Sequence, residues 1–206
     1  METSKVIEAI KKLREDKRKF TQSVEIIINL RGFDIKKESV NLFLELPHKT
    51  REIKVGAFLT KKSELVDSIL KADLDKYKEK KKAKSLIKNY DFFIASAVMM
   101  PTIAAALGKY LGPAGKMPYP QLGIVRNETD AEIKECMRKL ERVVRVKSKE
   151  PSLKFVVGKE NMKEEAIAEN FIYAFNAVLN ALPKKKENLK NVLIKFTMTK
   201  PIKLEI

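Results

Sequence analysis

The sequence predicts an α/β protein in which one domain is built from both ends of the chain and a second domain is inserted between them. Near the two ends, residues 23–30 and 192–199 largely alternate between apolar and polar side chains, a period of two that is typical of strands with one buried face. In the middle of the chain, apolar strands alternate with helical segments, which indicates a mainly parallel sheet.

The first and last strands are expected to lie in one sheet. In the last strand, the alternation turns Val192, Ile194, Phe196 and Met198 towards the core. The opposite side chains of the two strands would then share a polar surface. The residues expected there are Ser23, Glu25, Lys195, Thr197 and Thr199.

Further elements of this end domain follow from helical and strand patterns. Residues 3–17 predict an amphipathic helix, and strands are expected around 39–46 and 153–157. Asn161 is expected to open another helix through a capping box, and Pro183 ends it. The core stripe of that helix consists of Ile167, Phe171, Ala174, Val178 and Leu182.

The inserted segment begins with an apolar strand, after which Ser63 is expected to cap a helix that reaches Leu70. An alanine-rich helix later leads into LGPAGKMPYP, residues 111–120, where glycine and proline predict an irregular loop. The other elements expected are a strand at 53–59, a lysine-rich helix at 76–89, a strand at 92–95 and a helix at 129–141.

The chain is expected to cross between the domains near Arg51 and Arg142, where polar residues separate the patterns. The predicted end domain therefore comprises residues 1–51 plus 143–206, and the predicted inserted domain comprises residues 52–142. No secretory signal or membrane span is expected, because charges interrupt the N-terminal apolar runs and Pro101 interrupts the longest uncharged run. These features favour a cytoplasmic protein without a membrane partner.

The charge balance is strongly basic. Lys and Arg total 43 against 27 Asp and Glu, which gives a formal net charge of +16. Residues 184–206 alone contain seven Lys and two Glu. Such an excess favours a polyanionic partner, with nucleic acid first, over the alternative of a solvated lysine-rich surface of the kind found in thermophiles.

Catalytic chemistry finds little support. The chain has one histidine, His48, and one cysteine, Cys136. Two such ligands are too few for a zinc site, and a nucleophile–histidine arrangement has no second candidate histidine. Gly115-Lys116 is followed by Met117, where a phosphate-binding loop needs Ser or Thr. No enzyme activity, metal or cofactor is therefore expected. The alternative kept open is a small nucleotide-binding enzyme that uses the inserted α/β domain.

RNA binding is the favoured function. Phe20 follows basic residues and could stack on a base, and the alternative is a hydrophobic staple between helix and strand. Thr197 and Thr199 could contact ribose 2′-hydroxyls, which distinguish RNA from DNA. Cys136 is expected on the buried stripe of its helix as a small apolar residue.

Eight segments resemble the ribosomal protein L-one family, the large-subunit stalk protein, in its archaeal form. They cover nearly the whole chain in order, and LGPAGKMPYP together with the terminal Thr-Met is specific. The segments are KFTQSVEIIINL at 19–30, LPH at 46–48, YDFFIASA at 90–97, LGPAGKMPYP at 111–120, VGKENM at 157–162, IAEN with AVLNAL up to Leu182, and IKFTMT at 194–199.

The resemblance implies an α/β sandwich built from the chain ends, which binds 23S-type ribosomal RNA, and a Rossmann-like βαβ insertion joined to it by a flexible hinge. It also implies a monomer within the ribosome that forms the mobile stalk, assists release of exit-site transfer RNA and represses its own messenger RNA. The residues expected to contact RNA are Lys19, Phe20, Ser23, Glu25, Lys154, Thr197 and Met198, together with Thr199 from the strand pattern.

The sequence departs from this family in three places. Thr199-Lys200 replaces the usual Gly-Pro, and a side chain there is expected to hinder close approach of RNA to the backbone. Lys49 replaces the glycine after Leu-Pro-His, which predicts a stiffer hinge. The insertion is also shortened around residues 72–79.

Overall fold

The structure, a computed structural model, describes residues 2–16, 18–35, 37–38, 40–77, 79–120, 122–148 and 150–205. Its mixture of helices and strands confirms the predicted α/β class. Contacts between Cα atoms divide the chain into two compact units. We call Met1–Arg51 with Arg142–Ile206 the terminal unit, and Glu52–Glu141 the middle unit.

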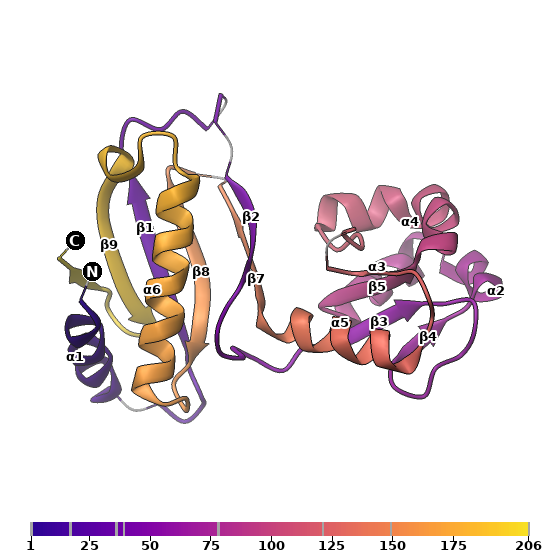
Figure 1. The fold of residues 1–206 in the computed structure, drawn as a ribbon, viewed down its shortest axis with the longest axis horizontal. Coiled ribbons are helices and arrows are strands. Elements are labelled where there is room, and N and C mark those ends of the chain that lie inside the picture. The colour runs from indigo at the N-terminus through magenta and orange to yellow at the C-terminus, as the bar shows by residue number, and fades with distance from the viewer. Residues whose placement is uncertain are drawn as a thin grey trace. The chain divides into compact units, whose positions relative to one another are not determined.

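The terminal unit is organised around a four-stranded sheet in the order β10-β9-β1-β8, in which every pair is antiparallel (Figure 1). The sheet brings the two ends of the chain together as expected: Ile26 of β1 lies opposite Ile194 of β9 and Phe155 of β8. The strands are β1 (Ser23–Leu30), β8 (Ser152–Lys159), β9 (Leu189–Phe196) and β10 (Ile202–Leu204).

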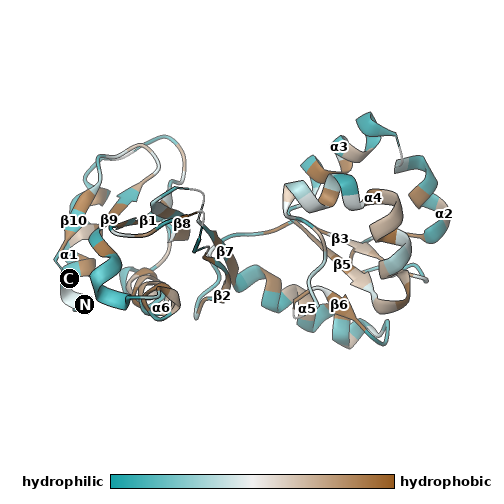
Figure 2. Cartoon of the chain, turned by 90° about the horizontal axis from the view of Figure 1, so that it is seen from above, coloured by the Kyte–Doolittle hydropathy of each residue, from teal (hydrophilic) through white to brown (hydrophobic). Residues whose placement is uncertain are grey.

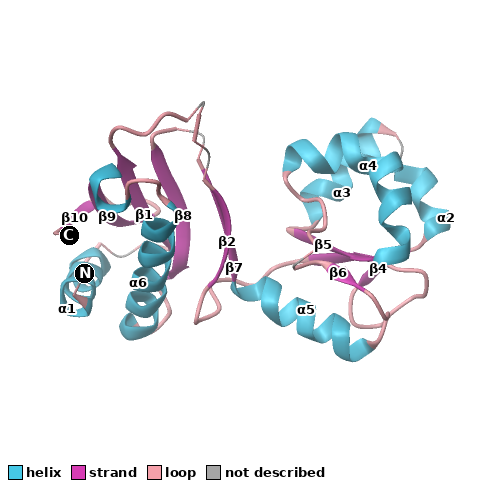
Figure 3. Cartoon of the chain, turned by 45° about the horizontal axis from the view of Figure 1, so that its top comes forward, coloured by secondary structure: helices cyan, strands magenta, loops and turns pink. Residues whose placement is uncertain are grey.

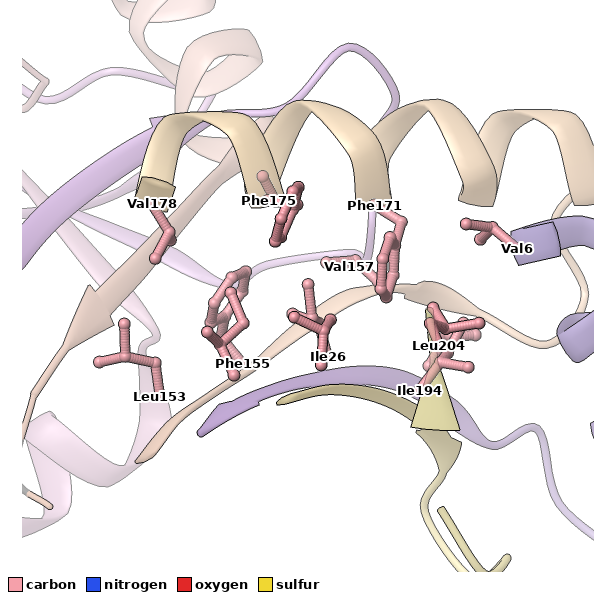
Figure 4. Close-up of a cluster of buried hydrophobic side chains, with 14 of the residues drawn as sticks. Val6, Ile26, Leu153, Phe155, Val157, Phe171, Phe175, Val178, Ile194 and Leu204 are labelled. Carbon is pink, nitrogen blue, oxygen red and sulfur yellow. The ribbon is translucent and has the colours of Figure 1, made fainter. Parts of the chain in front are cut away.

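Helices α1 (Thr3–Arg14) and α6 (Glu164–Ala181) pack their apolar stripes on one face of this sheet. Figure 4 shows the side chains of Phe171, Phe175 and Val178 on α6 directed at the strands, where they meet Ile26 and Phe155. All five residues of the predicted α6 stripe are buried. Each inward residue of β1 is buried and each alternate residue is partly exposed, as the period of two predicts.

The start of α6 differs from prediction. The residue at its N-cap is Lys163, without a side-chain cap hydrogen bond, so Asn161 does not form the expected capping box. Instead, Arg14 of α1 spans the junction. Its Nη1 donates to Glu164 Oε1 at 2.9 Å, and its Nη2 donates to the carbonyl oxygens of Glu160 and Met162 at 2.9 and 2.6 Å.

Two strands, β2 (Asn41–Glu45) and β7 (Val143–Lys147), form a separate antiparallel ribbon in the terminal unit. Leu44 and Val146 bury themselves in the same core as the main sheet. The predicted strand at 39–46 corresponds to β2, and Ser39 lies outside the described residues. After β2, the fully buried Asn170 of α6 holds the backbone of His48 by accepting from its N–H at 2.9 Å and donating to its carbonyl at 3.1 Å.

The middle unit has a parallel sheet in the order β4-β3-β5-β6, which confirms the predicted strand direction. Helices α3 and α4 lie on one face of the sheet and α5 lies on the other (Figure 3), and a separate apolar cluster fills each side. In Figure 2, α5 carries both hydrophobic and hydrophilic residues, as expected of a helix with one buried side. The elements are β3 (Val55–Phe58), β4 (Asp67–Ile69), α2 (Lys71–Leu74), α3 (Lys80–Asn89), β5 (Phe92–Ser96), α4 (Met100–Ala114), β6 (Ile124–Val125) and α5 (Asp130–Arg142).

The helix predicted from Ser63 to Leu70 is wrong, because this segment forms a turn and then strand β4. The Ser68 hydroxyl donates to the carbonyl oxygens of Ser63 and Val66 at 3.3 and 3.1 Å, and the Ser63 hydroxyl accepts from the Leu65 N–H at 3.3 Å. Such bonds give the backbone groups the partners that a helix would otherwise supply. The residues after the turn pair with β3 as strand β4 instead of forming a helix.

The LGPAGKMPYP segment ends helix α4 later than predicted, since the helix continues to Ala114 and Gly115 closes it with a positive φ of 67°. Lys116, which follows, donates from Nζ to the carbonyl oxygens of Ile87 and Tyr90 at 2.7 and 2.6 Å. Gly115 therefore closes α4 itself, whereas Lys116 closes the C-terminus of the neighbouring helix α3, where a cation is favourable. No helix of the described residues is long and apolar enough to cross a membrane.

Candidate RNA-binding surface

The predicted site residues occupy two adjoining parts of the terminal unit. Six of them lie where β1 begins and β9 ends, and two lie on the sheet face that α1 and α6 leave uncovered. The first group is Lys19, Phe20, Ser23, Thr197, Met198 and Thr199, and the second is Glu25 and Lys154.

Ser23 and Thr197 are joined by hydrogen bonds at the end of the sheet. The Ser23 N–H donates to Thr197 Oγ1 at 3.0 Å, and the Thr197 N–H donates to the Ser23 carbonyl at 3.1 Å. The Thr197 side chain is nevertheless exposed. This double link fixes the exit of β9 relative to the entry of β1.

Strand β9 stops at Phe196, so the predicted alternation does not extend to Met198. Residues 197–199 form a turn, and 61% of Met198 is exposed instead of facing the core. The turn is held by Thr199, whose Oγ1 accepts from the Phe196 N–H at 2.9 Å and whose N–H donates to the Phe196 carbonyl at 3.2 Å. Thr199 thus ends the strand, and its hydroxyl supplies the hydrogen-bond acceptor for the Phe196 N–H at the strand end.

Gln22 anchors this turn from inside and was not predicted as a site residue. It is fully buried; its Oε1 accepts from the Met198 N–H at 3.1 Å, and its Nε2 donates to the Asp16 carbonyl at 3.4 Å. Its backbone also exchanges bonds with Glu160. The signal was present in the sequence, because the alternation of β1 places Gln22 on the same inward side as Val24.

Phe20 is exposed over 52% of its surface and is not part of the apolar core. The structure therefore contradicts the hydrophobic-staple interpretation. A depression of about 360 Å³ lies beside it, lined by Arg18, Lys19, Phe20, Thr21, Glu160 and Asn161. Two exposed apolar side chains, Phe20 and Met198, thus flank the same sheet end.

The uncovered sheet face combines lysines with a partly exposed apolar centre. In one row across the strands, Lys203, Leu193, Ile27 and Lys154 lie side by side. In the next row, Lys195 lies opposite Glu25. Lys154 is exposed and its Nζ lies 3.3 Å from Glu150 Oε2. Lys203 was not predicted, because the three residues of β10 are too few to show a period.

The basic side chains of this arrangement can bind a polyanion. Among the described residues, no three His, Cys, Asp or Glu side chains gather in a way that could hold a metal. His48 Nε2 lies 2.6 Å from Glu169 Oε2 on the surface of α6. Cys136 is partly buried in the α5 core, where desolvation raises the pKa of its thiol and makes it less reactive.

In the middle unit, the carboxylate of Glu128 occupies the crevice at the carboxyl ends of the strands, where parallel sheets of this kind bind nucleotides. Beyond the carboxyl end of β3, Glu128 accepts from the N–H and the hydroxyl of Thr60 at 3.0 and 2.8 Å and from the Lys61 N–H at 3.1 Å. Burial opposes ionisation, but hydrogen bonds from Ser96, Thr60 and Lys61 outweigh it and lower the pKa of Glu128. This occupied crevice disfavours the nucleotide-binding alternative.

The sequence matches known proteins over nearly its whole length. Residues 10–200 match the profile of the Ribosomal protein L1p/L10e family. The chain is 37% identical to the large ribosomal subunit protein uL1 of Pyrococcus abyssi, over 98% of this chain and 95% of the relative. It is 37% identical to the uL1 protein of Thermococcus kodakarensis (98% and 97% covered) and 35% identical to that of Methanobrevibacter smithii (95% and 96% covered).

Proposed function

Since the chain belongs to the Ribosomal protein L1p/L10e family, we propose that it is a structural, non-enzymatic constituent of the large ribosomal subunit that binds the subunit's 23S-type RNA through its terminal unit. Within the subunit it forms the mobile stalk beside the exit site, as a monomer in the cytoplasmic ribosome. It assists release of deacylated transfer RNA and represses translation of its own messenger RNA by binding a similar RNA structure.

The observation that carries the proposal is the exposed Phe20–Met198 pair at a basic sheet end. An aromatic and a thioether side chain that remain open to solvent offer flat or adaptable surfaces for an unstacked base. Arg18 and Lys19 beside Phe20 supply phosphate contacts. The exposed hydroxyl of Thr197 adds a partner for a ribose 2′-hydroxyl.

We assign the RNA contact to Lys19, Phe20, Ser23, Glu25, Lys154, Thr197, Met198 and Thr199. Their roles differ in this assignment. Phe20, Met198 and the lysines meet RNA through their side chains, whereas Ser23 and Thr199 chiefly shape the backbone that RNA approaches. Glu25, an acidic residue opposite Lys195, accepts hydrogen bonds from bases or sugars.

A binding experiment on the full chain tests the proposal. We expect salt-sensitive binding to a stalk fragment of large-subunit ribosomal RNA and much weaker binding to duplex DNA of equal length. Phe20→Ala should lower the affinity for the stalk fragment about 5- to 100-fold, as expected for the loss of one stacked base. Tyr173→Ala is the matched control, because Tyr173 is 47% exposed on α6, the helix that covers the other face of the sheet.

The assignment to one unit has its own test. A shortened chain that joins residues 1–51 to 142–206 should fold and keep most of the affinity for the stalk fragment. If this chain folds but does not bind, while Glu52–Glu141 alone binds, the two units have been assigned the wrong way round.

A further inference from the structure

Helix α3 of the middle unit presents an array of lysines to solvent. Its sequence, KKKAKSLIKN, contains five lysines and no acidic residue. Ala83 and Leu86 are buried in the apolar core, and every lysine of the helix is exposed. The lysines are Lys80, Lys81, Lys82, Lys84 and Lys88.

These lysines are not placed to stabilise the folded chain. Within the described residues, Lys82 alone among them forms an ion pair, with Glu79 at 3.2 Å. Lys80, Lys84 and Lys88 follow one another at four-residue intervals, so they form a stripe of like charge about 12 Å long on one side of the helix. Like charges at this spacing repel each other and destabilise a helix.

The position of the lysines within α3 is also unfavourable for the isolated protein. The first turn contains Lys80, Lys81 and Lys82 and no acidic residue, although the N-terminal end of a helix favours negative charge. At the other end, the Nζ of Lys116 already closes the helix by its bonds to Ile87 and Tyr90. Helix capping therefore explains none of the lysines of the first turn, and ion pairing within the described residues explains only Lys82.

Helix α5, in the same unit, shows that this composition is not general for the chain. Its sequence, DAEIKECMRKLER, contains four acidic and four basic residues, with acidic groups in the first turn. Lys139 pairs with Glu135 at 2.7 Å. The two helices cover opposite faces of one sheet, so the excess positive charge is concentrated on the α3 side.

We propose that the exposed face of α3 is a second RNA contact, which binds the phosphate backbone of a double-helical RNA segment. A row of ammonium groups neutralises phosphates without reading sequence. Single strands are usually held by aromatic stacking, and this face carries only Ser85 and Asn89 besides its lysines. The inference rests on the proposed function in taking RNA as the partner, but it concerns a different unit and a different surface.

The test compares two triple variants of the full chain. One is Lys80→Gln, Lys81→Gln and Lys84→Gln, and the control is Lys61→Gln, Lys62→Gln and Lys134→Gln. Both remove three exposed charges from the middle unit, and glutamine has nearly the helix propensity of lysine. The probe is an RNA duplex of about 20 base pairs, titrated at several salt concentrations, with a single-stranded oligouridine of equal length beside it.

For the α3 variant we expect the slope of log affinity against log salt to fall by about 2, with about tenfold weaker duplex binding at low salt. The control should change less than half as much. The melting temperature of the α3 variant should stay equal or rise, because repulsion is removed. Equal duplex binding by the two variants would overturn the inference, as would a parent protein that prefers the single strand or an α3 variant that loses thermal stability while keeping its RNA affinity.

Binding to the stalk fragment separates this inference from the proposed function. Phe20→Ala changes the terminal unit alone and should weaken stalk binding, whatever the role of α3. If Phe20→Ala has its expected effect and the α3 variant binds duplex RNA like its control, the second contact is absent and the proposed function stands. If Phe20→Ala has no effect while the α3 variant weakens duplex binding, the proposed site fails and the second contact stands.

Discussion

The two units use their sheets differently. The terminal unit covers one face of an antiparallel sheet with α1 and α6, and the strand β1 accordingly alternates between buried and partly exposed residues. The middle unit covers both faces of a parallel sheet, and every residue of β3 is buried. A sheet of the first kind keeps a broad face for a ligand, whereas one of the second kind leaves only its loops, its edges and the outer sides of its helices.

This difference explains where binding chemistry can reside in each unit. The terminal unit can place lysines, an aromatic ring and hydroxyls on or beside one rigid sheet, so its contacts can be specific. The middle unit has closed the usual crevice at its strand ends with Glu128 and exposes a lysine-rich helix, which suits contact with phosphates of any sequence. One unit is therefore expected to recognise RNA and the other to add charge.

The largest expected effect comes from replacing one large side chain in the hydrophobic core of either unit with alanine. Phe171 of α6 and Phe58 of β3 are both fully buried, one in each unit. Replacing either with Ala should lower the free energy of unfolding of its own unit by about 3–5 kcal/mol. Phe171→Ala should reduce stalk binding much more than Phe58→Ala at moderate temperature, because Phe58 lies in the unit that is expected only to add charge. Thermal unfolding followed beside RNA titration checks this, and equal loss of binding by both variants would contradict the division of roles.

A smaller effect is expected at the internal anchor of the turn. Gln22→Leu removes the acceptor of the Met198 N–H and should cost about 1 kcal/mol of stability or more, because a partly buried donor loses its partner. It should also weaken RNA binding, since Met198 is no longer held. The control is Asn191→Ala, which breaks the 2.6 Å bond to Asn29 on the open face, where water can replace it. Denaturant titrations of both variants make the comparison.

Much of the fold could be predicted from periodicity. Long elements such as α6 and β1 repeat their pattern often enough to reveal both type and buried side. Short elements could not be found this way: β6 has two residues, β10 has three, and β4 competes with serine side chains that bond to the turn. What decides these segments is pairing with a neighbouring strand, which the local sequence does not contain.

The sequence predicted where several residues of the candidate site lie in the fold, but not how they bond. Residue pattern together with family resemblance indicated Phe20, Ser23 and Thr197, which the structure places at one sheet end. The predicted inward direction of the Met198 side chain was wrong. Alternation holds only while the strand pairs with its neighbour, and the bond of the Thr199 hydroxyl to the Phe196 N–H ends that pairing. The bonding of Gln22 was also beyond the sequence, since its partners lie 6 and 176 residues away along the chain.

A pH-dependent effect is expected in the middle unit. The pKa of Glu128 is lowered in the folded state, so its contribution to stability is present above the unfolded pKa of about 4.3 and is lost as the pH falls through the folded value. Glu128→Gln should therefore cost about 1 kcal/mol at pH 7, reduced by solvent because the group is partly exposed, and should cost much less near pH 3. RNA binding should not change. Unfolding curves at the two pH values check this.

The smallest expected effect concerns Thr199, where the family resemblance predicts glycine and easier access for RNA. In the structure, positive φ among described residues other than glycine occurs at Lys185 alone, so Thr199 has no strained backbone that glycine would relieve. Its hydroxyl accepts from the Phe196 N–H at 2.9 Å, and glycine would remove this bond and add flexibility. We therefore expect Thr199→Gly to weaken stalk binding by a factor of about 2 to 5, equivalent to a net hydrogen bond of about 0.5–1 kcal/mol.

Thr199→Ser is the matched variant, because it keeps the hydroxyl and removes only the methyl group. It should bind stalk RNA like the parent if the turn is what matters. Titrations of both variants at one salt concentration decide between two roles for this residue. If Thr199→Gly binds more tightly than the parent and Thr199→Ser lies between them, bulk at this position hinders RNA and the backbone itself forms the contact. If the serine variant matches the parent and the glycine variant is weaker, the chain has replaced a flexible glycine with a hydroxyl that fixes the same turn.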